Sequence, residues 1–263
     1  MTRVAAIVES RMSSRRLPGK NLLPILGRPM LSRLIERLKR CRSLDAICIA
    51  TSTDASDDPI QELAQAEGVA CHRGSLEDVL ERTLAAARSV AAELVVEITG
   101  DCPLVDPGIV DACVARYERG DVDYLVNVLD RLSFPIGFDV QVFAVSLLDE
   151  VARLADDPHE RANVTPYIYR RADRYRVVNL LAPPELDRPG YRLCVDYRED
   201  FELVTAIYAA LYPRDAAFRA QDVIGFLDAN PALAARNIGH EDAFEFPVSR
   251  GGARHELLAL DGR

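Results

Sequence analysis

Short apolar runs alternate along the chain with longer segments in which apolar residues recur at helical spacing. The helical segments are expected near 29–41, 57–67, 76–91, 106–119, 146–156, 160–171, 199–211 and 220–229. The apolar runs predict strands at 3–9, 45–51, 69–73, 93–99, 123–128, 139–143, 175–180 and 192–195. Alternation of this kind predicts an α/β fold built from right-handed βαβ units, with a mostly parallel, doubly wound sheet.

Several of the predicted strands are apolar without interruption, for example 46–50 and 94–96. A strand reads this way when both of its faces are buried, as in a parallel sheet covered by helices. The runs at 175–180 and 192–195 are expected to add to a sheet edge. We expect one domain over residues 1–230, followed by a tail at 231–263, or an arm that reaches a partner subunit.

The composition is that of a globular protein, with 263 residues, 49% hydrophobic content, 6% aromatic content and no tryptophan. The apolar run near the N-terminus, Val4 to Val8, stops at Glu9. It is too short for a signal-peptide core, and no run approaches the roughly 20 residues that cross a bilayer. A cytoplasmic location, without membrane insertion, is therefore expected.

Charge is unevenly distributed. The chain has a formal net charge of −9, yet residues 1–50 hold 11 Lys and Arg against three acids. The overall acidity argues against a polymeric nucleic-acid partner, and the basic segment favours a small anionic ligand. The six cysteines form no Cys-x-x-Cys pair, so we interpret them as buried reduced thiols rather than a disulfide or zinc framework.

The basic segment follows the first predicted strand directly, over residues 9–21. It holds Arg11, Arg15, Arg16 and Lys20, and Gly19 lies among them. Fixed cations and free backbone N–H groups at a strand end suit a polyphosphate, although a solvated basic turn is the alternative. The segment is not a Walker loop, and no Gly-x-Gly-x-x-Gly follows any strand.

Two aspartates end apolar strands: Asp101 in the middle of the chain and Asp196 late in it. Mg²⁺ is usually bound by one or two carboxylates together with phosphate oxygens and water, so this pair is a candidate site for it. Each aspartate taken alone is more typical of a helix cap or a turn. Asp106, which precedes Pro107, is predicted to cap a helix.

The sequence resembles the CMP-sugar synthetases, and more closely their branch of spore-coat polysaccharide biosynthesis protein F. The resemblance covers about residues 3–212. It is carried by motifs at 11–20, 27–31, 50–52, 73–80, 99–104, 134–140 and 195–196.

The resemblance implies a GT-A-like nucleotide-diphospho-sugar transferase fold for a single cytidylyltransferase domain. It implies transfer of CMP from CTP to an acidic sugar of the 2-keto-3-deoxy or nonulosonic type, with release of pyrophosphate, for surface polysaccharide synthesis. A cytoplasmic homodimer that uses Mg²⁺ is expected. The implied catalytic residues are Arg11, Arg16, Lys20 and Asp101, the metal ligands are Asp101 and Asp196, the nucleotide contacts are Ser14, Gly19, Arg73, Ser75 and Asp78, and the acceptor contacts are Gly137, Asp139, His159 and Arg161.

The chain departs from the family pattern in three places. Glu9 and Ser10 stand where relatives usually have a neutral residue and alanine, and Arg15 replaces a small hydroxyl residue. The stretch 161–165 lacks the Glu-His that commonly lies there, which leaves the identity of the acceptor open.

Three alternatives stay open. One is a sugar-1-phosphate or phosphonate nucleotidyltransferase, which shares the leaving group. Another is a glycosyltransferase that consumes a nucleotide sugar, since 121–123 reads Asp-x-Asp. The third is a nucleotide-binding subunit without catalytic activity.

Overall fold

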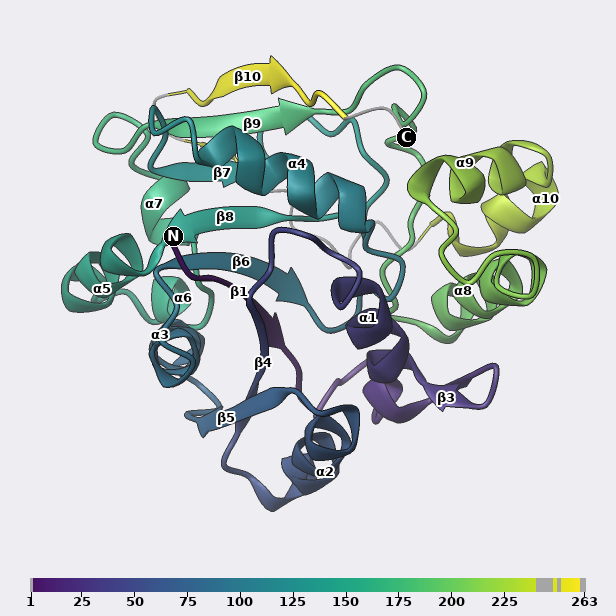
Figure 1. Cartoon of the computed structure of the whole chain (residues 1–263), viewed down its shortest axis with the longest axis horizontal. Helices are drawn as coiled ribbons and strands as arrows, with labels where there is room; N and C mark the ends of the chain where they lie inside the picture. Colours follow the sequence, from purple (N-terminus) through teal and green to yellow (C-terminus); the bar gives the residue numbers. More distant parts are fainter. Residues whose placement is uncertain (1, 240–247, 250–251, 261–263) are drawn as a thin grey trace.

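The computed structural model describes residues 2–239, 248–249 and 252–260. Its centre is an eight-stranded sheet in the order β10-β9-β7-β8-β6-β1-β4-β5 (Figure 1). Only β8 among these strands runs antiparallel to its neighbours, β6 and β7. The strands are β1 (Val4–Glu9), β4 (Ala46–Ser52), β5 (Ala70–Gly74), β6 (Leu94–Thr99), β7 (Tyr124–Val126), β8 (Gln141–Ala144), β9 (Val177–Leu181) and β10 (Arg254–Leu257). The predicted α/β fold with a mostly parallel sheet is confirmed.

Helices cover both faces of this sheet, as Figure 1 shows with α3, α5 and α6 on one side and α1, α8 and α9 on the other. They are α1 (Met30–Leu38), α2 (Asp58–Glu67), α3 (Val79–Ser89), α4 (Pro107–Tyr117), α5 (Val145–Leu154), α6 (Pro158–Arg161), α7 (Pro166–Tyr169), α8 (Arg198–Leu211), α9 (Ala220–Asp228) and α10 (Pro231–Ala234). Successive residues of β1 alternate between two buried apolar clusters, with Ala6 and Val8 on the α1 side and Ala5 and Ile7 on the α3 side. This double burial explains the uninterrupted apolar strands.

Several predicted boundaries come from local chemistry that the structure shows directly. Asp106 caps α4, because its carboxylate accepts hydrogen bonds from the backbone N–H groups of Gly108 (2.7 Å) and Ile109 (3.2 Å). Pro107 occupies the first turn, where the missing N–H costs nothing. The interpretation of Asp106 as a cap is confirmed.

Two predicted elements are wrong. Residues 192–195 do not form a strand of the sheet, since Arg192 makes only an isolated bridge with Ile136. The predicted helix over 160–171 is two short helices, α6 and α7, because Pro166 has no backbone N–H to continue a helix and begins α7 instead.

Other elements were not predicted. A two-stranded ribbon, β2 (Pro24–Ile25) with β3 (Arg28–Pro29), precedes α1, and a 3-10 turn, η1 (Lys20–Leu22), precedes the ribbon. The segment predicted as a tail or arm contains α10, the 3-10 turn η3 (Ala235–Asn237) and β10, which pairs in parallel with β9 of the same chain. The boundary at residue 230 stays a prediction. Of the residues described, no helix is long and apolar enough to span a bilayer.

Candidate active site

The basic loop, residues 10–19, leaves the carboxyl end of β1 and is held by the protein around it. The backbone N–H of Met12 donates to Asp57 (2.7 Å), and the amide of Asn21 donates to the carbonyl of Arg11 (3.0 Å). Gly19 closes the loop with φ +71°, a left-handed conformation that side chains disfavour, and its N–H donates to the carbonyl of Met12 (3.1 Å). The loop therefore has a fixed shape.

Lys20 follows the loop and lies at the centre of a buried ionic cluster. Its Nζ donates to Oδ2 of Asp101 (2.7 Å), Oδ1 of Asp196 (3.0 Å) and the carbonyl of Val195 (2.7 Å). Only 8% of Lys20 is exposed. Burial acts to lower the pKa of the ammonium, but the two carboxylates outweigh it and raise the pKa, so Lys20 is charged.

Two arginines complete the cluster around Asp196. Arg16 contacts Oδ1 at 2.6 Å and Arg192 contacts Oδ2 at 2.7 Å. Burial tends to raise the pKa of Asp196, but Lys20 and Arg16 lower it below its usual value. Arg16 also lies over the ring of Tyr197, 5.5 Å from its centroid. Both oxygens of Asp196 are thus occupied by cations.

A layer of residues that the sequence did not single out supports Asp196. Asp200, which is fully buried, accepts from the N–H groups of Asp196 and Tyr197 (both 2.9 Å), from Arg192 (3.2 Å) and from Asn237 (2.8 Å). The one sequence signal for it was its position three residues after the N-cap of α8, Tyr197, where a carboxylate commonly bonds back to the N-cap.

The structure thus brings four of the predicted site residues together: Arg16, Lys20, Asp101 and Asp196. The remaining loop residues have other surroundings. Oγ of Ser14 accepts from the N–H of Leu17 (3.3 Å). Arg11 and Arg15 are exposed.

The predicted nucleotide contacts in β5 and in the loop after it form hydrogen bonds and ion pairs within the protein. Arg73 donates to the carbonyl of Ser52 (2.8 Å) and to Asp58 (2.6 Å), which braces the β4–α2 connection. Asp78 caps α3 and accepts from Arg161 (2.6 Å), so a predicted nucleotide contact and a predicted acceptor contact form one ion pair. The Asp78 N–H in turn donates to Oγ of Ser75 (2.9 Å).

The remaining predicted acceptor contacts lie in two places. Gly137, with φ +108°, packs against the backbone of Leu193 and Cys194 so closely that a Cβ would lie 2.6 Å from it. Asp139 accepts from the N–H of Gly137 (3.3 Å), and removal from water raises its pKa to about 7. His159 is exposed on the first turn of α6.

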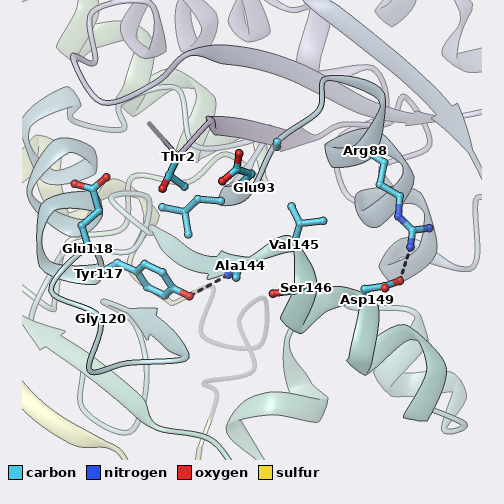
Figure 2. A pocket seen from close by; sticks show the side chains of 12 residues that line it. Thr2, Arg88, Glu93, Tyr117, Glu118, Gly120, Ala144, Val145, Ser146 and Asp149 are labelled. Atoms are coloured by element: carbon cyan, nitrogen blue, oxygen red, sulfur yellow. Dashed lines mark hydrogen bonds and ion pairs between the residues drawn. The ribbon is translucent and has the colours of Figure 1, made fainter.

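A cavity of about 880 Å³ lies elsewhere, at the amino edge of the sheet (Figure 2). Its lining includes Glu93 before β6, Ala144 at the end of the antiparallel β8, and Tyr117 of α4, whose hydroxyl accepts from the N–H of Ala144 (3.1 Å). Arg88, the cation in its wall, is paired with Asp149. Among the described residues that line this cavity there is one cation, whereas Lys20, Arg16 and Arg192 converge in the Lys20 cluster, so we place the chemistry there.

The cluster is chemically suited to a nucleoside triphosphate and a cation: it combines fixed positive charge with two carboxylates that reach one point. A sequence model described as cytidylyltransferase matches residues 5–223. The chain belongs to the cytidylyltransferase family. Spore coat polysaccharide biosynthesis protein SpsF of Bacillus subtilis is 32% identical over 241 residues, which cover 89% of this chain and 98% of the relative.

Solved structures agree with this membership. A cytidylyltransferase from Leptospira borgpetersenii superposes with a TM-score of 0.84 and 31% identity, over 90% of this chain and 98% of that one. A CMP:2-keto-3-deoxy-manno-octonic acid synthetase complexed with CTP has the same fold, with a TM-score of 0.62 at 16% identity, over 79% of this chain and 99% of the other. The predicted nucleotidyltransferase fold and cytidylyltransferase activity class are confirmed.

The Asp-x-Asp sequence at 121–123 is accounted for differently in this cytidylyltransferase. Asp121 pairs with Arg116 (2.7 Å) and Arg254 (2.6 Å), and Asp123 pairs with Arg176 (2.7 Å). Both carboxylates tie segments of the chain together, so the glycosyltransferase alternative has no support from them.

Proposed function

We propose that this cytidylyltransferase transfers CMP from CTP to a hydroxyl of an acidic sugar of the 2-keto-3-deoxy or nonulosonic type, for surface polysaccharide synthesis. The hydroxyl oxygen forms a bond to the α-phosphorus while the bond to the bridging oxygen breaks. Pyrophosphate leaves and the hydroxyl proton is lost. The observation that carries the proposal is the convergence of Arg16, Lys20, Asp101 and Asp196 beyond the end of β1.

We assign the triphosphate to the basic loop. Arg16 contacts Asp196 in the Lys20 cluster, Arg11 and Arg15 are exposed on the same loop, and forked arginine donors suit phosphate oxygens. Charge grows on the phosphoryl oxygens in the transition state, so fixed cations there stabilise it more than the ground state. Catalysis of this kind depends on positioning and electrostatics, and it needs no protein nucleophile.

Asp101 and Asp196, next to the basic loop, suit Mg²⁺. Asp101 and Asp196 each have an oxygen within 3.0 Å of the Lys20 ammonium, so one divalent cation between them could be held by both carboxylates. Two carboxylates with phosphate oxygens and water are a common Mg²⁺ donor set. When bound, the metal supplies positive charge to the phosphoryl oxygens.

The test measures pyrophosphate release from CTP, UTP, ATP and GTP with Mg²⁺ and a panel of acceptors. We expect release with CTP and a 2-keto-3-deoxy or nonulosonic sugar acid. Release that requires a sugar 1-phosphate or a phosphonate would overturn the acceptor class and leave cytidylyl transfer standing. No release with any acceptor would favour a binding subunit. The homodimer and the cytoplasmic location remain predictions, and sedimentation analysis tests the first.

A further inference from the structure

A second polar cluster, separate from the Lys20 cluster, lies beneath the carboxyl ends of β1 and β6. Glu9 ends β1 and Glu97 lies in β6, and their side chains are hydrogen-bonded to each other. Thr83 of α3 donates its hydroxyl to Oε1 of Glu9 (3.2 Å). Arg82, the residue before Thr83 on α3, interacts electrostatically with Glu9. Burying ionic groups costs free energy unless they are paired, so this cluster requires an explanation.

The charges in this cluster can be assigned from its contacts. Burial is the main cause that raises the pKa of both glutamates, and the neighbouring Glu9 raises that of Glu97 further, well above its usual value. Thr83 donates to Glu9, and Arg82 lowers the pKa of Glu9 against the effect of burial. We therefore assign the shared proton to Glu97 and treat Glu9 as the carboxylate, which can only accept hydrogen bonds.

Arg82 is buried, and its hydrogen bonds are only partly satisfied. Its Nη1 donates to the carbonyls of Ser75 (2.6 Å) and Leu76 (3.3 Å), in the loop between β5 and α3. Gly74 leaves room for it, since a Cβ there would lie 3.0 Å from the Arg82 side chain. Only 4% of Arg82 is exposed, yet within the described residues its Nε has no acceptor.

Arg82 Nε is one of several unpartnered polar atoms at this edge of the sheet. Across the part of the chain that the structure describes, the buried Oγ of Ser10, Oγ1 of Thr51 and Oε2 of Glu97 also lack partners. A buried polar atom without a partner costs about 1–3 kcal/mol, and such atoms are rare in folded proteins. Their concentration beside the basic loop indicates a place where a polar ligand group completes the bonding.

We propose that Glu9 and Arg82 read the nucleobase, so that a carboxylate acceptor and a guanidinium donor select cytosine. The inference deepens the proposed function and rests on it. Glu9 directly precedes the loop assigned to the triphosphate, so the base of the same nucleotide lies within reach of the cluster. Cytosine presents a 4-amino donor next to the N3 and O2 acceptors, and Glu and Asp are suited to accept from that amino group.

Uracil is disfavoured by the same pair. Its O4 is an acceptor, which would face the Glu9 carboxylate, and its N3 is a donor, which would face the guanidinium. Neither contact can form a hydrogen bond. Glu97 and Thr83 act as positioning residues, because they orient the Glu9 carboxylate without facing the base.

The experiment measures binding of CTP and UTP by calorimetry in the full chain and in two matched variants, Glu9→Gln and Glu62→Gln. An amide at position 9 can turn to donate to O4 of uracil, so Glu9→Gln is expected to lower the CTP:UTP affinity ratio at least tenfold. Glu62 is an exposed glutamate on α2 outside the cluster, so the ratio of Glu62→Gln is expected to stay within threefold of the parent. Equal ratios in the parent and Glu9→Gln would overturn the inference.

A second measurement does not depend on the variants folding. A CTP analogue with hydrogen in place of the 4-amino group is expected to bind the parent protein at least tenfold more weakly than CTP. Equal affinity would show that nothing accepts from that amino group. Nucleotide binding needs no acceptor sugar, so failure of the proposed sugar class leaves this test unaffected, whereas a parent protein that binds no CTP would refute the proposed function itself.

Discussion

Lys20 shows how burial and charge combine in a single residue. A lysine that is 8% exposed would lose its proton more readily without partners, and here Asp101 and Asp196 reverse that tendency. Without Lys20, Asp101 would lose its ion-pair partner, whereas Asp196 would keep Arg16 and Arg192. Removing Lys20 is therefore expected to affect both catalysis and stability.

Lys20→Met is expected to lower kcat/KM for CTP by about 10²–10³-fold, comparable to loss of one oxyanion-hole donor. Pyrophosphate release under saturating acceptor measures it. Lys39→Met is the matched control, since Lys39 is an exposed lysine that contacts the backbone carbonyl of Glu67. Near-parental turnover in Lys20→Met, with the fold intact by circular dichroism, would contradict the site assignment.

Asp139 predicts a pH dependence of stability. Its folded pKa of about 7 lies above the ordinary value of 3.8, so the folded state binds the extra proton between those two values. Its contribution to stability is therefore full below about pH 4 and is lost as pH rises through 7. In metal-free buffer, Asp139→Asn is expected to gain stability relative to the parent between pH 5 and pH 8, measured by urea unfolding. A constant difference across that range would contradict the prediction.

Among the elements, the segment 192–196 shows where reading the pattern succeeded and where it failed. Its apolar residues are buried as predicted, but their backbone bonds to Ile136 and Asp101 rather than to a strand. An apolar run indicates that a segment is buried, but which backbone it bonds to depends on residues far away in the sequence. For the same reason Arg192, Asp200 and Asn237 could not be recognised: they meet only once the chain has folded.

Most other elements were predictable because local rules and tertiary structure agree. The strands at the β1, β4, β5 and β6 positions match their apolar runs closely, and α4 begins at its Asp-Pro cap. The basic loop and Asp101 were visible because they follow strands whose carboxyl ends meet at one edge, and Asp196 was visible because it ends an apolar run, although that run is not a strand. Arg82 was not singled out, since a sequence cannot show that a helical arginine is buried or that its Nε lacks an acceptor among the described residues.

Gly137→Ala tests whether close backbone packing holds the segment that carries Asp196. A Cβ would lie 2.6 Å from the backbone of Leu193 and Cys194, and φ +108° is strained for alanine. The free energy of unfolding is therefore expected to fall by about 1–3 kcal/mol. Gly120→Ala is the control, because φ is +79° there but nothing lies within 4 Å. Thermal unfolding together with kcat/KM compares them. Equal effects of the two changes would show that conformational strain alone matters.

Across the whole molecule, β10 joins the last described part of the chain to the body of the protein. Arg116 on α4 contacts Glu256 (2.6 Å) and Asp121 (2.7 Å), and Arg254 contacts Asp121 (2.6 Å). Arg116 is largely buried, so its charge requires both partners. β10 is therefore held at the edge of the sheet by a network of ion pairs as well as by its backbone hydrogen bonds to β9.

Glu256→Gln is expected to reduce the free energy of unfolding by about 1–3 kcal/mol, since it weakens a hydrogen-bonded partner of a buried cation. Urea denaturation measures it. Glu118→Gln serves as the control at an exposed glutamate on the C-terminal end of α4. If both variants unfold at the same urea concentration as the parent, β10 adds little to the stability of the sheet.

The position of the Lys20 ammonium has a consequence for how the pocket fills. Its nitrogen donates to one oxygen of each aspartate. If Asp101 and Asp196 held a divalent ion together, they would have to give up these bonds to Lys20, and the ammonium group would then be available to a phosphate. Ligand binding at this cluster would in that case replace an internal ion pair, so its net electrostatic gain would be smaller than at a site without one.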